Sequence, residues 1–103
     1  MSDHVEIQVT CGSHDEADRI AAALVDGRLA ACVQRLPIRS TYRWEGEVQH
    51  DDEVLLLVKT VAARFDDVAA TVRELHSYDV PAITAVPIVR GSDDYLAWID
   101  AET

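Results

Sequence analysis

Residues 47–60 read EVQHDDEVLLLVKT, and five consecutive apolar residues, 54–58, stand between Glu53 and Lys59. These residue types favour a β-strand, in which successive side chains point to opposite faces of the sheet. The run therefore predicts a sheet that must be covered on both faces. Because a single layer of helices covers only one face, we expect another copy of the chain to cover the other.

The same stretch forms one arm of a predicted hairpin. Residues 31–44 and 47–60 favour strands, and Glu45-Gly46 between them favours a tight turn. An arm of about 14 residues at about 3.3 Å each spans roughly 45 Å, whereas a 100-residue domain has a radius of gyration near 13 Å. We expect the hairpin to overrun its own domain and its edges to pair with other chains, as in a closed trimer. The alternative is that Pro37 and residues 50–53 break the arms into shorter strands.

The remaining pattern predicts three helices and two further strands. Alternating apolar residues indicate a strand at 5–11, and helical spacing follows from Ser13, with Glu16 completing a capping box, to Gly27. A second helix is expected at 62–76, a strand at 82–89 and a short helix after residue 92.

This order, β-α-β-β-α-β, is the split βαβ pattern, an α+β fold whose antiparallel sheet has the strand order 4-1-3-2. We expect one domain spanning 1–103. Pro37 and Pro87 fall in the second and fourth strands, which this order places at the edges, where proline is tolerated.

The composition excludes several classes of partner. Nineteen acidic residues against nine basic ones give a net charge of −10, which disfavours nucleic acid because that binding depends on clustered Lys and Arg. No apolar run suits a membrane span and no signal peptide is visible, so we expect a cytoplasmic protein. The two cysteines, Cys11 and Cys32, are expected to be free thiols.

Five segments resemble, in order and spacing, the CutA family of divalent-ion tolerance proteins. They are ACV (31–33), YRWEGEV (42–48), EVLLLVKT (53–60), HSYDVPAI (76–83) and YLAW (95–98). The resemblance implies a ferredoxin-like fold, a homotrimer with strand pairing between subunits, and association with divalent cations, especially copper. The family usually reads HPYxxPE, whereas this chain has Ser77 in place of the first proline and Ala82 in place of the glutamate.

Cys11 and His76 are the candidate metal ligands. In the predicted fold the end of the first strand and the end of the second helix share one edge of the sheet, and a thiolate with an imidazole suits copper or zinc. The resemblance implies the same two residues as copper ligands. A third ligand from water or another subunit is then needed. The alternative is a buried cysteine and a histidine favoured by the end of a helix.

Two further groups have more than one interpretation. Tyr42, Trp44, Lys59 and Tyr78 are candidates for a cleft between subunits, or else packing residues of an interface. Lys59 is expected to pair with an acid or to meet an anionic ligand. The acidic run 50–53 is expected to be a solvated face that attracts cations weakly.

Together these features predict a trimeric, non-enzymatic divalent-cation tolerance protein with weak to moderate binding of copper or another divalent cation and no obligatory cofactor. One alternative is a sensor resembling the PII signal proteins, which binds an anionic ligand at clefts between subunits. The short turn at 45–46 and the absence of a basic cluster disfavour it. The other is a small hydrolase, which the absence of catalytic motifs disfavours.

Overall fold

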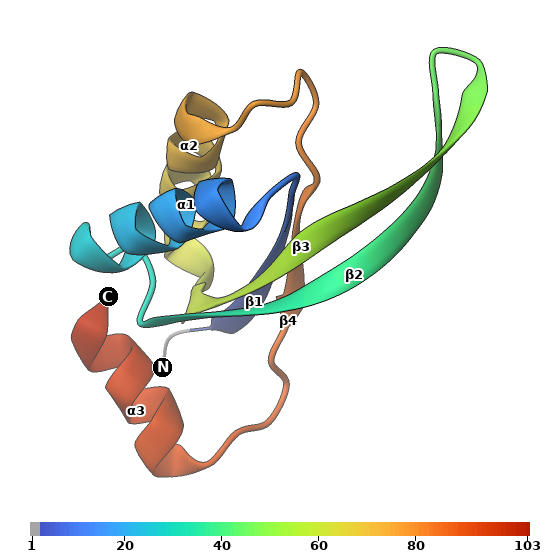
Figure 1. Ribbon diagram of the computed structural model, residues 1–103. Coiled ribbons are helices and arrows are strands. Elements are labelled where there is room, and N and C mark those ends of the chain that lie inside the picture. The colour runs from blue at the N-terminus through green and yellow to red at the C-terminus, as the bar shows by residue number, and fades with distance from the viewer. Residues whose placement is uncertain (1–2) are drawn as a thin grey trace.

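The computed structural model describes residues 3–103 as a four-stranded sheet with two helices on one face and a third helix at one end (Figure 1). The elements are β1 (His4–Cys11), α1 (His14–Asp26), β2 (Cys32–Trp44), β3 (Glu47–Val61), the 3₁₀ turn η1 (Ala62–Arg64), α2 (Phe65–Leu75), β4 (Ile83–Pro87) and α3 (Asp93–Glu102). This order confirms the predicted β-α-β-β-α-β pattern. No helix within residues 3–103 is both long enough and apolar enough to cross a membrane.

The sheet is antiparallel and has the order β2-β3-β1-β4, which is the predicted order read from the opposite edge. β1 pairs with the second half of β3, and this pairing ends where Cys11 lies opposite Val54. Both edge strands contain a proline, Pro37 in β2 and Pro87 at the end of β4. These positions agree with the prediction, because a proline at an edge costs the ladder least.

One hydrophobic core holds α1 and α2 against the sheet. Burial of alternate strand residues and of one stripe of each helix provides the driving force for this packing. The core side chains are Val5, Ile7, Val9 and Cys11 of β1, Ala17, Ile20 and Leu24 of α1, Val54, Leu56 and Val58 of β3, Val68 and Val72 of α2, and Ala30.

The apolar run of β3 points to both faces of the sheet, as predicted. Val54, Leu56 and Val58 are buried beneath the helices, whereas Leu55 and Leu57 are half-buried on the opposite face. The sheet therefore has an apolar strip on the face that α1 and α2 leave open.

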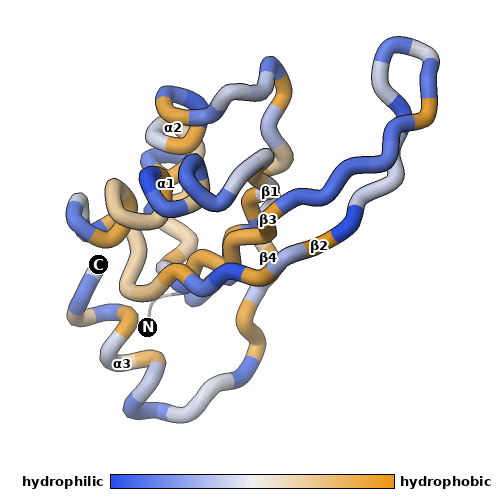
Figure 2. The backbone as a smooth tube through the Cα atoms, viewed as in Figure 1, coloured by the Kyte–Doolittle hydropathy of each residue, from blue (hydrophilic) through white to orange (hydrophobic). Residues whose placement is uncertain are grey.

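The β2–β3 hairpin overruns the rest of the domain, which confirms the prediction and excludes the alternative of broken arms. From the pair Ile38–Glu53 outward the two strands pair only with each other, and Figure 1 shows them projecting beyond the other strands. The turn uses Glu45 and Gly46 at positive φ (50° and 84°), the backbone that a two-residue hairpin turn requires. The molecule measures 44 × 25 × 21 Å. Figure 2 shows that the projecting part is mainly hydrophilic.

Two predicted elements differ at their ends. The second helix begins as a 3₁₀ turn and becomes α-helical only from Phe65, and His76 after it has extended backbone (φ −82°, ψ 143°). β4 is shorter than the predicted 82–89, because it pairs only with β1 and that pairing ends at Pro87, opposite Val5.

The third helix, α3, lies at the end of the sheet where β1 begins (Figure 1). It is fixed there by burial of Ile99 and by a 3.0 Å contact between His4 Nε2 and Asp100 Oδ1. Tyr95 and Trp98 of the same helix pack against each other with ring centroids 5.7 Å apart but stay partly exposed.

Candidate metal centre

Cys11 is the last residue of β1, and its side chain is fully buried. The alternation of β1 dictates this position, because Val5, Ile7 and Val9 precede it on the core face. The thiol is free, as predicted, and so is that of the half-buried Cys32.

His76 directly follows α2, and its ring lies beside the end of β1. Its side chain is fully buried. The ring Nε2 lies 2.7 Å from the carbonyl oxygen of Thr10, and Nδ1 accepts a hydrogen bond from the backbone N–H of Tyr78 at 3.1 Å. Since a carbonyl oxygen can only accept, Nε2 carries the proton and Nδ1 is the basic nitrogen.

Glu16 is the third member of the group, and sequence reasoning assigned it only a capping role. The predicted capping box is half formed. Ser13 Oγ accepts the hydrogen bond from the Glu16 N–H at 3.2 Å, but the Glu16 carboxylate turns inward instead of returning to the N–H of Ser13. It accepts from the backbone N–H of Gly12 at 3.4 Å and from that of Ser77 at 2.6 Å.

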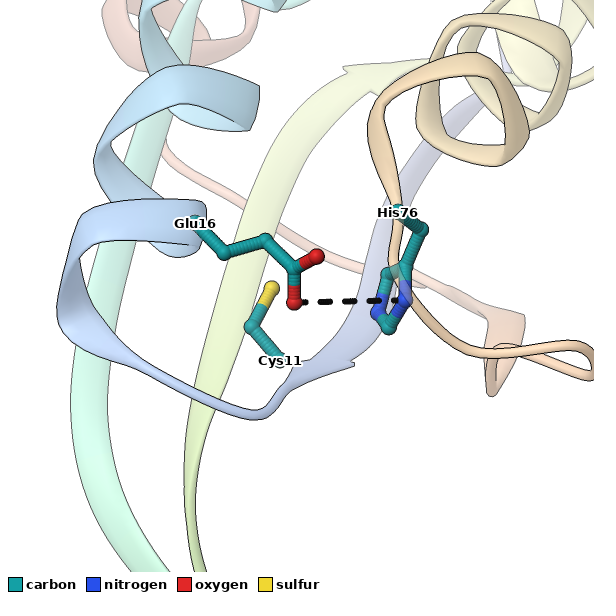
Figure 3. Close-up of side chains that lie close together, drawn as sticks. All are labelled: Cys11, Glu16 and His76. Atoms are coloured by element: carbon teal, nitrogen blue, oxygen red, sulfur yellow. Dashed lines mark ion pairs between the residues drawn. The ribbon is translucent and has the colours of Figure 1, made fainter.

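The three side chains come from β1, α1 and the segment after α2, and they converge (Figure 3). One ligand atom from each of Cys11, Glu16 and His76 lies within 4.8 Å of the other two. Glu16 Oε2 and His76 Nδ1 are 4.0 Å apart. The expected proximity of Cys11 and His76 is therefore present, with a carboxylate beside them.

The charge states of the group follow from its burial and hydrogen bonds. Burial, and then the charges of Glu16 and Glu53, raises the pKa of the Cys11 thiol from 9.0 to about 11. Burial also opposes ionisation of Glu16, but the hydrogen bonds from Ser77 and Gly12 outweigh it and lower the pKa of that carboxyl. The group without an ion is thus a thiol beside a carboxylate.

The two departures from the HPYxxPE pattern, Ser77 and Ala82, both line a pocket next to this group. Ser77 supplies the N–H that binds Glu16, a donor that proline lacks. Ala82 lines a neighbouring pocket and brings no carboxylate there.

Three of the four residues predicted for a cleft lie together. Tyr42, Trp44 and Tyr78 line a pocket of about 510 Å³ at the base of the projecting hairpin, together with Thr10, Ser40, Glu53, Ser77, Asp79, Val80 and Ala82. Lys59 is not part of this pocket. Its ammonium group is paired with Glu6 of β1, the acid-pairing alternative for this residue, and so it is not a free partner for an anionic ligand.

The acidic run 50–53 is mostly a solvated face, as expected, with one correction. His50, Asp51 and Asp52 are exposed, but Glu53 is only 7% exposed and accepts a hydrogen bond from the Tyr78 hydroxyl at 2.8 Å. Sequence reasoning missed this burial because the partner, Tyr78, comes from a distant loop.

The split βαβ sheet and the buried thiol, imidazole and carboxylate define a small ferredoxin-like protein with a candidate metal centre. The chain belongs to the CutA1 divalent ion tolerance protein family, whose model matches residues 5–102. The resemblance seen in the sequence is thereby confirmed. The family description names tolerance of divalent ions.

Some individual relatives match over nearly their whole lengths. The chain is 47% identical to the divalent-cation tolerance protein CutA of Thermus thermophilus over 98 residues, covering 94% of this chain and 95% of the relative. The solved periplasmic divalent cation tolerance protein CutA of Archaeoglobus fulgidus superposes with a TM-score of 0.95 at 42% identity, covering 96% of this chain and 97% of that one. CutA1 of Oryza sativa superposes with a TM-score of 0.96 at 38% identity, covering 99% and 94%. The cytoplasmic location stays a prediction.

Proposed function

We propose that this divalent-cation tolerance protein binds one divalent cation per chain through Cys11, Glu16 and His76. The observation that carries the proposal is the convergence of three buried donors from three separate segments within 4.8 Å. Buried ionisable groups are costly unless they are paired or bind a metal. Here the carboxylate accepts hydrogen bonds from two backbone N–H groups and lies beside the Cys11 thiol and the His76 ring, and no Lys or Arg within the described residues pairs with it.

The donor set fits copper or zinc. Sulfur and imidazole nitrogen are ligands that these ions prefer, and three protein donors leave a further position for water. His76 Nδ1 is the available nitrogen, because Nε2 is held by the Thr10 carbonyl, an arrangement that orients a ligand ring. Metal binding would release the proton of the Cys11 thiol. It would also break the hydrogen bond that His76 Nδ1 accepts from the Tyr78 N–H.

Calorimetric titration with Zn²⁺ and, under anaerobic conditions, Cu²⁺ tests the site. We expect one ion per chain, and a loss of affinity on the order of 100-fold or more in Cys11→Ser, Glu16→Gln and His76→Ala. The matched controls are Cys32→Ser and His50→Ala, which change the same residue types outside the group. Equal affinity in wild type and in the Cys11→Ser, His76→Ala double variant would refute the site.

We further propose that the working form is a homotrimer. Two features support this: the outer part of the hairpin, whose strands pair only with each other, and the apolar strip of Leu55 and Leu57 on the open face of the sheet. Unpaired edges and apolar faces are satisfied together when copies of a chain close into a ring. Sedimentation equilibrium at micromolar concentration should give three times the chain mass of 11.4 kDa, and a well-folded monomer would refute the proposal.

A further inference from the structure

The pocket at the base of the hairpin is built from aromatic rings and carboxylates. Ser40, Tyr42 and Trp44 alternate along β2, and the pairing of Ile38 with Glu53 places all of them on the same face of the hairpin as Glu53. The volume of about 510 Å³ lies in the range of small-molecule sites.

Tyr78 closes one side of this pocket. Its hydroxyl binds Glu53, its ring packs edge-on against His76 at a centroid distance of 4.7 Å, and it passes over Gly12. Tyr42 is likewise held, since its hydroxyl donates a hydrogen bond to Asp51. Two of the three rings are thus positioned by hydrogen bonds to acids, which is the preorganisation that a binding site requires.

The pocket has a negative charge without a matching positive one. Glu53 is only 7% exposed, and its one side-chain hydrogen bond within the described residues comes from a neutral hydroxyl, that of Tyr78. It makes no ion pair within residues 3–103, and no Lys or Arg lines the pocket, whereas Asp79 adds a second carboxylate. A buried carboxylate in this setting is stabilised by a cation.

We propose that this pocket binds a small organic cation with an alkylated ammonium group, placed among the rings of Tyr42, Trp44 and Tyr78 beside Glu53. Aromatic rings attract such cations through their negative faces, and the attraction is strongest where water is excluded. An anion would be repelled by Glu53 and Asp79. A small hydrated metal ion would leave the apolar rings unused.

The site uses other ligand groups than the metal centre, although Tyr78, which lines the pocket, contacts His76 through its ring and its backbone N–H. Cys11 lies on the core face of the sheet, whereas Thr10, which lines the pocket, lies on the opposite face. Binding is therefore measured in the presence of a chelator, so that its outcome is independent of the proposed metal function.

Choline is the probe, and 3,3-dimethyl-1-butanol is its uncharged counterpart of nearly the same shape. In the Trp98→Phe protein, Trp44 is the one remaining tryptophan. We expect choline to change its fluorescence saturably and the alcohol to bind about tenfold or more weakly. Equal binding of the two compounds would overturn the proposal, because shape alone would then suffice. If choline leaves the Trp44 fluorescence of the assembled protein unchanged, the proposal is also overturned. The pocket would then be closed or filled by another copy of the chain.

Variants of two glutamates, one in the pocket and one outside it, separate the charge of the pocket from the general charge of the protein. Glu53→Gln keeps a hydrogen-bond acceptor for Tyr78 but removes the charge, and we expect about a tenfold loss of choline affinity. Glu74→Gln removes the same charge from the exposed face of α2, away from the pocket lining, and should stay within about twofold of the starting protein. Circular dichroism checks that both variants fold. Equal affinities of the two variants would contradict a role for Glu53.

Discussion

The carboxylate of Glu16 accepts a hydrogen bond from the backbone N–H of Ser77 at 2.6 Å, across 61 positions of sequence. This bond ties the start of α1 to the segment after α2 and sets the position of His76 beside Cys11. It depends on a residue other than proline at position 77, because proline has no N–H. The departure from the family pattern at Ser77 therefore provides the backbone N–H that Glu16 binds.

Replacing Ser77 with proline should weaken the fold. His76 already has the extended backbone that proline requires of the residue before it, so the main change is loss of the donor to Glu16. We expect a loss of about 1–3 kcal/mol in the free energy of unfolding, measured by urea denaturation. Ser77→Ala keeps the N–H and removes only the hydroxyl, whose hydrogen bond also lowers the pKa of Glu16, so we expect a smaller loss of about 0.5–1 kcal/mol. Similar losses in both variants would show that the hydrogen bond contributes little.

The buried Cys11 thiol should make the protein less stable at high pH. Its pKa is raised from 9.0 to about 11, so the folded state holds this proton more tightly than the unfolded state does. The resulting stability is present below pH 9 and is lost as the pH rises through about 11. The loss amounts to at most about 3 kcal/mol.

Denaturation in a chelator at pH 8.5 and pH 10.5 measures this effect. Cys11→Ser has no group at position 11 that ionises in this range, so its stability should fall less over the same interval. Parallel losses in the two proteins would mean that other groups, not Cys11, control the high-pH behaviour.

Gly12 should be sensitive to addition of a methyl group. A Cβ atom at this position would lie 2.9 Å from the Tyr78 hydroxyl oxygen, so Gly12→Ala must shift Tyr78 and weaken its bond to Glu53. We expect a loss of about 1–3 kcal/mol, since Glu53 then loses its buried partner. In a Tyr78→Phe background the same change should cost less, and a double-mutant cycle measures the difference. Additive effects would contradict the contact.

The Glu6–Lys59 pair should stabilise the open face at neutral pH but not in acid. The hydrogen bond from Lys59, followed by that from Gln8, lowers the pKa of the Glu6 carboxyl. Its contribution is therefore present above pH 4.5 and is lost as the pH falls below that value. Glu6→Gln should cost about 1 kcal/mol at pH 7 and progressively less in acid, as measured by urea denaturation. A constant cost across pH would exclude the ion pair as its cause.

The sequence predicted those features that depend on local pattern. Alternation placed Cys11 at the buried end of β1, and the strand order brought it near His76. Glu16 could not be assigned to the metal group from the sequence, because a role in the capping box explained a glutamate at this position. The N–H that draws its carboxylate inward belongs to Ser77, which is 61 residues away. Glu53 was predicted to be solvated for the same reason, since its partner Tyr78 is distant in sequence.

Native mass spectrometry with and without added Zn²⁺ tests the central proposal most directly, because it counts chains and ions in the same particle. We predict a trimer of 11.4 kDa chains that gains up to three zinc ions, one for each Cys11–Glu16–His76 group, and a Cys11→Ser, His76→Ala variant that remains trimeric and gains none. A monomer, or a variant that takes up as many ions as wild type, would contradict the account.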